Sequence, residues 1–271
     1  MAFVLGSWSE RAYAWYMDIR VLSIGALSGH PLWDERGAVR TGHMTTTLVR
    51  TGGVGGVGGA VIVVDPGLPG QMIEARLAER AGIGVSDVTH VFLTSFNPEG
   101  RRGIGVFEHA KWLISPTERE AVGVPLAQSL GQLAQSKAAC EERGEEFPED
   151  ERVLMEMLVG DVELLSKIEA APDSIAPGVD LFPLAGVSAG TCGLLVSEAT
   201  STTLICGDAV ATVEHLMAGQ VLEGADRKAA MGSFAEAVEI ADYLVLGRDN
   251  MVHNTVARGS PVGGNMPKDL L

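Results

Sequence analysis

The sequence LTSFNPEGRRGI, residues 93–104, closes an apolar segment that begins at His90. A short apolar run bounded by turn residues predicts a buried strand, and the Asn-Pro and Glu-Gly pairs after it predict a tight loop. The loop places Ser95, Asn97 and Glu99 just past the end of the strand but contains no histidine or cysteine. It therefore presents polar side chains at a strand end without the donors that zinc prefers.

The composition is that of a soluble globular protein with acidic character. Of the 271 residues, 46% are hydrophobic and 20% are charged, which is the range of globular domains. The formal net charge of −15 argues against nucleic acid or an anionic membrane surface as a partner, because both need clusters of Lys and Arg. No run of apolar residues reaches the length of a membrane helix. Neither nucleic acid nor a membrane is an expected partner.

The cysteines and the N-terminal segment indicate the compartment. Cys140, Cys192 and Cys206 are too few and too scattered for a disulfide framework or a thiolate zinc site. We expect Cys192 and Cys206 to be small core residues, and the odd number of cysteines fits a reducing compartment. The first 20 residues lack a basic leader, and polar residues interrupt their apolar run, so they do not predict a signal peptide. The expected location is the cytoplasm.

Strand-like segments occur in two groups on either side of a central helical region. They are rich in β-branched residues and bounded by Gly, Pro or Asp. The predicted strands are 19–24, 45–49, 60–64, 90–93, 112–114, 181–184, 193–196, 202–206 and 243–246. The segment TGGVGGVGG, residues 51–59, predicts a hairpin loop, since Gly adopts turn conformations without steric cost. A phosphate cradle is the alternative, but the Lys-Ser/Thr ending and the following helix are missing.

Helical periodicity appears in three regions. Apolar residues recur at three- and four-residue spacing after Pro69-Gly70 and again from 227 to 241. The longest helical region is predicted to run from about Pro125 to about 170, within a helical insert at about 117–170. Its acidic segment, 141–151, predicts an exposed turn between two helices. We expect a single domain over 1–271, with a core at about 18–256 and an irregular tail from about 257.

The order of these elements resembles the metallo-β-lactamase fold family. Val64-Asp65-Pro66-Gly67 is similar to the family's Asp-x-Gly turn, which closes an early strand before a helix. The strand after that helix ends in Thr-His-x-His-x-Asp-His in the family, and Thr94 begins the matching segment here. The resemblance covers about residues 18–256. It implies an α/β fold of the α+β kind, a four-layer αββα sandwich in which two sheets pack face to face with helices outside.

The resemblance also implies which positions would hold two metal ions. Seven positions match the family's ligands: Ser95, Asn97, Glu99, Gly100, Val187, Asp208 and Arg248. Five of these are histidines in the family and none is a histidine here; Glu99 replaces an aspartate, and only Asp208 is unchanged. Zinc takes imidazole, thiolate or carboxylate donors, usually at least three from the protein, so we expect no dinuclear zinc site and no other cofactor. The alternative is a single divalent ion, such as Mg²⁺ or Ca²⁺, held by Asn97, Glu99 and Asp208.

Glu99, Asp208 and Arg248 remain as candidates for chemistry. The resemblance brings them to one end of the sheets, where Arg248 replaces a fixed cation and pairs with Asp208 or Glu99. The predicted pocket consists of the seven matched positions together with Asp65. A purely structural ion pair and a polar pocket that binds a ligand are both open interpretations.

The histidines do not predict a catalytic centre. His43, His215 and His253 each border one of the matched turns and are expected near the mouth of the pocket. No pair has the i, i+2 or i, i+4 spacing of a metal site, and a lone histidine is more often structural. Ser95 has no histidine near it in the sequence, so a serine nucleophile is not supported.

Two functions follow from the resemblance. The first is a ligand-binding or scaffolding module descended from a metal-dependent hydrolase, with a degenerate active site, and therefore a pseudoenzyme. Its expected partners are a small molecule, another protein, or further copies of itself in a homo-oligomer. The alternative is a hydrolase of an ester, lactone or thioester whose site is metal-free or holds a metal other than zinc, with Glu99, Asp208 and Arg248 as catalytic residues. Because a fold does not fix a function, the enzyme question stays open.

Overall fold

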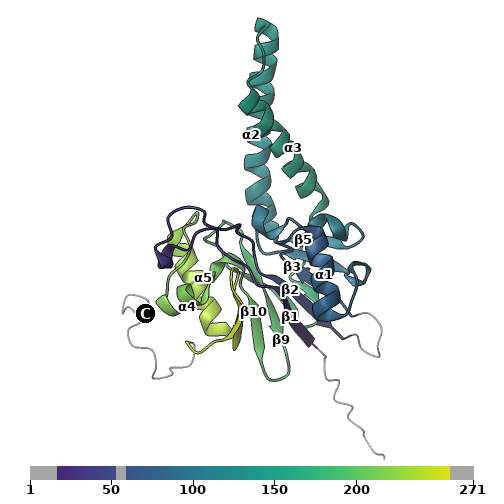
Figure 1. The fold of residues 1–271 in the computed structure, drawn as a ribbon, viewed down its shortest axis with the longest axis vertical. Coiled ribbons are helices and arrows are strands. Elements are labelled where there is room, and N and C mark those ends of the chain that lie inside the picture. The colour runs from purple at the N-terminus through teal and green to yellow at the C-terminus, as the bar shows by residue number, and fades with distance from the viewer. Residues whose placement is uncertain (1–16, 53–58, 257–271) are drawn as a thin grey trace, which may run out of the picture.

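The structure, a computed structural model, describes residues 17–52 and 59–256. Within these ranges the strands form two six-stranded sheets (Figure 1). The first contains, in spatial order, β1 (Met17–Ser23), β2 (Thr46–Thr51), β3 (Val61–Val64), β4 (His90–Leu93), β5 (Lys111–Ile114) and β6 (Glu169–Ala170). The second contains β12 (Met251–His253), β11 (Tyr243–Val245), β10 (Thr202–Ile205), β9 (Cys192–Ser197), β8 (Val179–Pro183) and β7 (Ser174–Ala176). Every predicted strand overlaps an observed one, whereas the short strands β6, β7 and β12 were not predicted.

The direction of each strand follows from the connection before it. β1, β2 and β3 are antiparallel neighbours, while β3, β4, β5 and β6 are parallel because helices and long loops return the chain to the same edge. In the second sheet β10 and β11 are parallel and the other neighbours are antiparallel. The antiparallel pairing of β2 with β3 agrees with a hairpin connection. Most of the glycine-rich connector (53–58) and the predicted irregular tail lie outside the described residues.

Side-chain alternation along β4 shows how the layers are built. Phe92 packs between the two sheets, in a cluster that includes Leu194 of β9. Val91 and Leu93 point to the opposite face and pack with Leu77 of helix α1 (Gly70–Ala81). This period of two is what a strand buried on both faces requires. Each sheet therefore has one face toward the other sheet and one face toward helices.

Helices complete the outer layers. The outer face of the first sheet is covered by α1 and by the bases of α2 (Pro116–Arg143) and α3 (Glu149–Lys167), which contributes Leu165. The outer face of the second sheet is covered by α4 (Val213–Ala218) and α5 (Arg227–Ile240), through Leu216 and Phe234. The predicted four-layer αββα sandwich is confirmed.

The start of the long helical region differs from the prediction. α2 begins at Pro116, and Pro125 lies inside it. The earlier signal is Ser115, whose side chain accepts a hydrogen bond from the Glu118 N–H at 3.1 Å, with proline at the first helical position. The predicted turn between two helices is confirmed, because Gly144 ends α2 with φ +69° and α3 begins at Glu149.

Two further expectations concern the cysteines and membrane spans. Cys192 and Cys206 are buried core residues, as predicted, and Cys140 is buried as well. Burial raises the pKa of the Cys192 thiol to about 12, so it is an inert core group at neutral pH. Among the residues that the structure describes, no helix has both the length and the apolar character needed to cross a membrane.

Candidate functional site

Arg248 joins two carboxylates at one edge of the sandwich. Its Nε donates to Oδ1 of Asp208 at 2.6 Å, one Nη donates to Oδ2 at 2.8 Å, and the other Nη donates to Oε2 of Glu99. Arg248 is 5% exposed and Asp208 is 3% exposed. Burial lowers the pKa of the guanidinium, but the hydrogen bonds and charges of Asp208 and Glu99 outweigh it, so the pKa lies above its ordinary value. The guanidinium and Asp208 form a buried bidentate ion pair.

Turns at the ends of strands position these side chains. Glu99 lies in the 3-10 turn η4 (Pro98–Gly100) after β4, and the Asn97 side chain caps this turn by accepting from the Glu99 N–H at 3.0 Å. Asp208 lies in the turn η6 (Gly207–Ala209) after β10, and Arg248 follows β11. The carboxyl ends of parallel strands meet at one edge of a sheet, which is where side chains from several loops converge.

Two glycines allow the turns that carry Asp208 and Arg248 to touch. A Cβ on Gly247 would lie 2.2 Å from the carbonyl oxygen of Gly207. Gly207 itself has φ +54°, and a Cβ there would lie 2.5 Å from the hydroxyl oxygen of Thr94. Neither position has room for a side chain, so the ion pair depends on both glycines.

Asp65 is a separate buried carboxyl group. The Thr94 N–H donates to its Oδ1 at 2.9 Å and the Thr94 hydroxyl donates to its Oδ2 at 2.7 Å. Its backbone is left-handed, with φ +48°. Burial raises the pKa of Asp65 to about 7 despite the hydrogen bonds from Thr94, and the negative charge of Asp208 adds to the increase. Asp65 therefore titrates near neutral pH.

Glu118 fixes the loop after β4 to the base of α2. It is 2% exposed. Its Oε1 accepts from the Phe96 N–H at 2.9 Å, and its Oε2 accepts from the Ser188 hydroxyl at 2.6 Å and from the Gly190 N–H at 3.1 Å. One buried carboxylate thus ties two loops that are far apart in the sequence to the first turn of a helix.

Arg101 fixes the same loop to α3. One of its Nη atoms donates to Oδ1 of Asp161 at 2.7 Å, and its Nε donates to the carbonyl oxygen of Phe96 at 3.1 Å. The guanidinium also lies over the Phe96 ring, 4.2 Å from its centroid. The loop that carries Asn97 and Glu99 is therefore held by both long helices.

The structure brings together four of the eight predicted pocket residues. Asn97 donates from Nδ2 to Oδ2 of Asp208 at 3.3 Å, so Asn97, Glu99, Asp208 and Arg248 form one hydrogen-bonded cluster. This arrangement agrees with the expected pairing of Arg248, which contacts both carboxylates rather than one of them.

The other four predicted residues have different surroundings. Gly100 lies against Asp65, since a Cβ there would be 3.4 Å from Asp65 Oδ1. Ser95 is buried. Val187 accepts a backbone hydrogen bond from Ala225 at 3.2 Å, in the segment before α5. Within the described ranges, neither Ser95 nor Val187 is hydrogen-bonded to the Arg248 cluster.

The cluster does not fit a metal ion. No group of three or more His, Cys, Asp or Glu side chains within residues 17–52 and 59–256 is placed to hold one. Both oxygens of Asp208 accept from the guanidinium of Arg248, whose positive charge stands where a bound cation would be. A dinuclear zinc centre and a single ion on Asn97, Glu99 and Asp208 both conflict with this geometry, because either requires Arg248 to leave its carboxylates.

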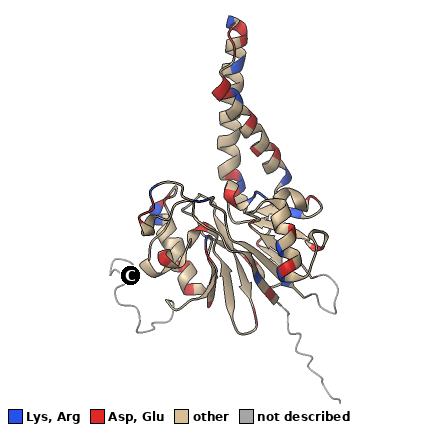
Figure 2. Ribbon diagram, in the orientation of Figure 1, with Lys and Arg blue, Asp and Glu red and all other residues tan. Residues whose placement is uncertain are grey.

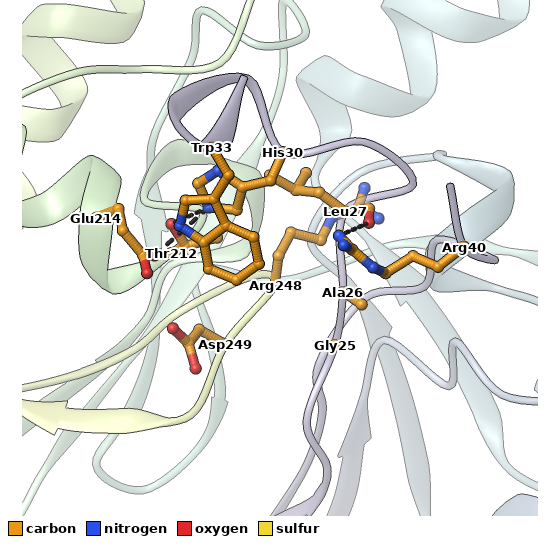
Figure 3. A pocket seen from close by; sticks show the side chains of 10 residues that line it. All are labelled: Gly25, Ala26, Leu27, His30, Trp33, Arg40, Thr212, Glu214, Arg248 and Asp249. Carbon is orange, nitrogen blue, oxygen red and sulfur yellow. Dashed lines mark hydrogen bonds and ion pairs between the residues drawn. The ribbon is translucent and has the colours of Figure 1, made fainter. Parts of the chain in front are cut away.

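A pocket of about 250 Å³ adjoins the cluster (Figure 3). It is lined by Gly25, Ala26, Leu27, His30, Trp33, Arg40, Thr212, Glu214, Arg248 and Asp249. Of the predicted site residues, Arg248 alone is in this wall. Figure 3 shows the carboxylates of Glu214 and Asp249 on one side of the Trp33 ring and Arg40 on the other. The pocket is small for a drug-sized molecule and suits a compact ligand.

A buried polar network forms the back of the pocket. The Thr212 hydroxyl lies 3.1 Å from Nε2 of His30 and 2.9 Å from Nδ1 of His215. Oε2 of Glu214 is 3.4 Å from the same His30 Nε2, and the Trp33 ring stacks on His30 with centroids 4.2 Å apart. His30 Nδ1 has no hydrogen-bond partner among the described residues, although the side chain is buried. An unpaired buried polar atom of this kind is uncommon in a folded protein.

The network sets the charge of two groups beside the pocket. Burial lowers the pKa of His215, and the nearby His30 lowers it further. Burial raises the pKa of Glu214, but hydrogen bonds from its own backbone and from Thr212 outweigh it, so the pKa falls below its ordinary value. At neutral pH His215 is therefore neutral and Glu214 is ionised.

Most of this wall was not predicted from the sequence. Of the three histidines expected at the pocket mouth, His215 belongs to the network, whereas His43 contacts the carbonyl oxygen of Ile24 and His253 packs on Tyr243. His30 and Trp33 were not predicted, because the segment that carries them has no periodic pattern. The one usable signal was Thr212, whose side chain caps α4 and whose spacing to His215 is that of a helix N-cap.

Comparison with known proteins finds similarity in structure alone. No family model matches the sequence, and no curated protein sequence matches it. A hydrolase of the β-lactamase superfamily, AbOPH, superposes with a TM-score of 0.58 at 14% identity, over 90% of this chain and 94% of that one. A candidate metallo-β-lactamase from Thermotoga maritima superposes with a TM-score of 0.55 at 16% identity, over 88% of this chain and 99% of that one. AidC, a dizinc quorum-quenching lactonase, gives 0.53 at 14% identity, over 80% and 78%.

Proposed function

This chain has the metallo-β-lactamase fold, and from that premise we propose that it is a pseudoenzyme that binds a small molecule without a metal centre, in the pocket beside Arg248. The observation that carries the proposal is the ion pair between Arg248 and both oxygens of Asp208. A guanidinium is a permanent cation, so it satisfies the buried carboxylates that a metal ion would otherwise balance. With three free, buried cysteines, we also assign the protein to a reducing compartment, the cytoplasm.

The charges around the pocket favour a cationic ligand. Arg40 pairs with Glu35, and Arg248 pairs with Asp208 and Glu99, so both arginines of the wall are neutralised by carboxylates behind it. The carboxylates of Glu214 and Asp249, by contrast, have no Lys or Arg within ion-pair distance among the described residues. The net charge of the pocket wall is therefore negative, and it attracts an ammonium group.

Trp33 and His30 support the same ligand class. Trp33 is 54% exposed, and its ring is held in place by stacking on His30. An aromatic ring next to carboxylates is a recurrent site for organic cations, and the Arg40 guanidinium already lies over the Trp33 ring, 5.7 Å from its centroid.

Hydrolysis without a metal is the second candidate, and one observation favours it. AidC and AbOPH are a lactonase and a hydrolase, and here the pocket wall contains an imidazole next to a carboxylate, His30 and Glu214. Such a pair can orient a general base toward water. Three of the five N–H groups of Arg248 are used by Asp208 and Glu99, which leaves donors that could polarise an ester, lactone or thioester carbonyl.

Calorimetric titration in the presence of EDTA tests the proposal. The probes are choline and its uncharged isostere 3,3-dimethyl-1-butanol, with γ-butyrolactone and hexanoate as neutral and anionic acyl compounds. We expect choline to bind, the isostere to bind at least tenfold more weakly, and Trp33→Ala and Glu214→Gln to weaken choline binding about tenfold or more. Glu198→Gln is the matched control, because Glu198 is an exposed carboxylate bonded to Ser201 outside the pocket wall.

Each outcome has a clear reading. Binding that appears only after zinc is added would contradict a metal-free site. Equal binding of choline and its isostere would leave the pocket in place but refute the charge argument. Turnover of γ-butyrolactone that survives EDTA and is lost in His30→Gln would favour the second candidate over the first. Elemental analysis of protein purified without chelator provides the metal content directly, and about one equivalent or more that is lost in Asp208→Ala would refute the proposal.

A further inference from the structure

Residues 27–42 form a closed loop between β1 and β2, beside α4 (Figure 1). At its stem, two backbone hydrogen bonds of 2.8 and 3.0 Å join Ala26 to His43. Inside the loop, the Val39 N–H donates to the carbonyl oxygen of Ser28 at 2.8 Å. A segment of roughly 6–16 residues whose ends meet and which packs on itself is an Ω-loop, a class that is frequently functional. We refer to residues 27–42 as the Ω-loop.

The Ω-loop rests on the sandwich without joining its core. Its large aliphatic side chains are Leu27, Leu32 and Val39, and none of them belongs to the three buried hydrophobic clusters of the described chain. Figure 2 marks the charged residues along the loop, which are Asp34, Glu35, Arg36 and Arg40. A segment with few buried apolar contacts has low local stability, so it can move while the rest of the protein stays folded.

Polar contacts with α4 fasten the Ω-loop. His30 Nε2 lies 3.1 Å from the Thr212 hydroxyl and 3.4 Å from Oε2 of Glu214, and the Trp33 side chain is hydrogen-bonded to Glu214 as well. Among the described residues, the other side-chain hydrogen bonds of the Ω-loop stay within it. His30 Nδ1 is buried without a partner in this part of the chain, which is a desolvation cost that water relieves when His30 leaves its place.

The pocket is the space between the Ω-loop and the rest of the chain (Figure 3). The Ω-loop contributes Leu27, His30, Trp33 and Arg40 to its wall, and the opposite part consists of Thr212, Glu214, Arg248 and Asp249. Near the stem the loop also covers the ion-pair cluster, since a Cβ on Gly42 would lie 2.4 Å from Oε1 of Glu99. A ligand that fills this space contacts both parts of the wall and enters as they separate.

We propose that the Ω-loop is a lid over the pocket, which moves about its stem and is held shut by the contacts of His30 with α4. The ligand rests on the proposed function, whereas the lid follows from the loop itself. An ammonium ion between Trp33 and Glu214 contacts both parts of the wall and therefore favours the closed position. Opening makes two imidazoles accessible, because His30 is 3% exposed and His215 is 2% exposed in the closed structure.

Carbethoxylation by diethyl pyrocarbonate at about pH 7, followed by peptide mass spectrometry, tests the proposal on the full chain. We expect His30 to react more slowly than His109, which is exposed. Thr212→Val removes the hydroxyl that His30 contacts and should raise the His30 rate roughly twofold to tenfold, the effect of one hydrogen bond on the opening equilibrium. Thr212→Ser is the matched control, because it keeps the hydroxyl and should react like wild type.

A second variant separates the lid from the cap of α4, to which Thr212 also contributes. His30→Phe keeps an aromatic ring against Trp33 and leaves the Thr212 cap in place, but it breaks the polar contacts with α4. In this variant, a rate at His215 at least twofold above wild type reports the opening. Labelling of the Cys206 thiol, which is 0% exposed, reports unfolding of the whole protein, and its rate should not change in either variant.

The outcomes separate the lid from its ligand. A change below twofold in either folded variant overturns the lid. So does a wild-type His30 that reacts as fast as His109, since the loop is then not closed, or an equal increase at Cys206, which indicates global unfolding. Choline should slow the reaction of His30 in wild type. If both variants respond as expected but choline neither binds in calorimetry nor slows His30, the lid stands and the proposed ligand class is wrong.

Discussion

Replacement of Asp65 by asparagine should remove most of one pH-dependent contribution to stability. Asp65 is buried, and its pKa is raised from 3.8 to about 7. Between these values the folded protein binds a proton that the unfolded chain does not, so the free energy of unfolding falls as the pH rises. The stabilising contribution of the protonated carboxyl is fully present below pH 3.8 and is lost as the pH passes through about 7.

The magnitude follows from the shift. A difference of about 3 pKa units at about 1.4 kcal/mol per unit corresponds to roughly 4 kcal/mol, and about 3 kcal/mol of this falls between pH 5 and pH 8. The substituted asparagine side chain has no charge at any pH, can accept from the Thr94 N–H and donate to the Thr94 hydroxyl, and tolerates the left-handed backbone at φ +48°. The variant should therefore gain stability relative to wild type as the pH rises.

Urea denaturation followed by circular dichroism at pH 5, 6, 7 and 8 provides the measurement. Asp34→Asn is the matched control: Asp34 is also left-handed, with φ +55°, but exposed, so its profile should run parallel to that of wild type. A stability difference between Asp65→Asn and wild type that stays constant from pH 5 to pH 8 would refute the assignment of a raised pKa to Asp65. If Asp65→Asn instead loses stability relative to wild type as the pH rises, the ionised carboxylate is the form that stabilises the fold.

Three further predictions concern the site and its supports. Arg248→Met leaves Asp208 buried without a cation and should lower the free energy of unfolding by about 3–5 kcal/mol. The double variant Arg248→Met with Asp208→Leu should recover part of the lost stability. Chemical denaturation measures both variants, and a loss below about 1 kcal/mol in Arg248→Met would contradict the ion-pair argument. Glu118→Gln presents an amide N–H to groups that themselves donate and should lower the free energy of unfolding by about 1–3 kcal/mol. Hydrogen exchange should become faster in the two loops that Glu118 holds. Unchanged exchange in these loops would show that Glu118 does not hold them. Gly207→Ala should destabilise more than Gly219→Ala, since both have positive φ but only the first places a Cβ against a neighbouring side chain; equal melting temperatures would show that the turn adjusts freely.

The sequence was most informative where structure is local. The strand at 90–93 and the helix after Pro69 follow from periodicity and turn residues, because these signals act within a few positions. The predicted start of the long helical region, Pro125, lies inside α2, which begins at Pro116 after the Ser115 cap. Proline in the middle of a helix destabilises it, but packing against α3 stabilises α2 enough to offset this effect.

The candidate site was predictable only in its outline of turns. The convergence of Asn97, Glu99, Asp208 and Arg248 could be expected from the order of strands, which brings the turns that carry them to one edge. The wall formed by His30 and Trp33 could not, because its contact with Thr212 spans 182 positions in the sequence and depends on the path of an irregular loop. Tertiary contacts of this kind leave no periodic trace.

Helices α2 and α3 form a hairpin that projects from the sandwich (Figure 1), and the contacts at its base have a mechanical consequence. Glu118 and Arg101 grip the site loops close to the point where the two helices enter the sandwich, while the tip lies about 35 Å away. By the geometry of a rigid arm, a tilt of about 5° moves the tip by about 3 Å but the Glu118 carboxylate by well under 1 Å. The hairpin therefore acts as a lever, and a small force applied at the tip produces a much larger force at the base. Restraining the tip should accordingly damp the motion of the loop that carries Asn97 and Glu99.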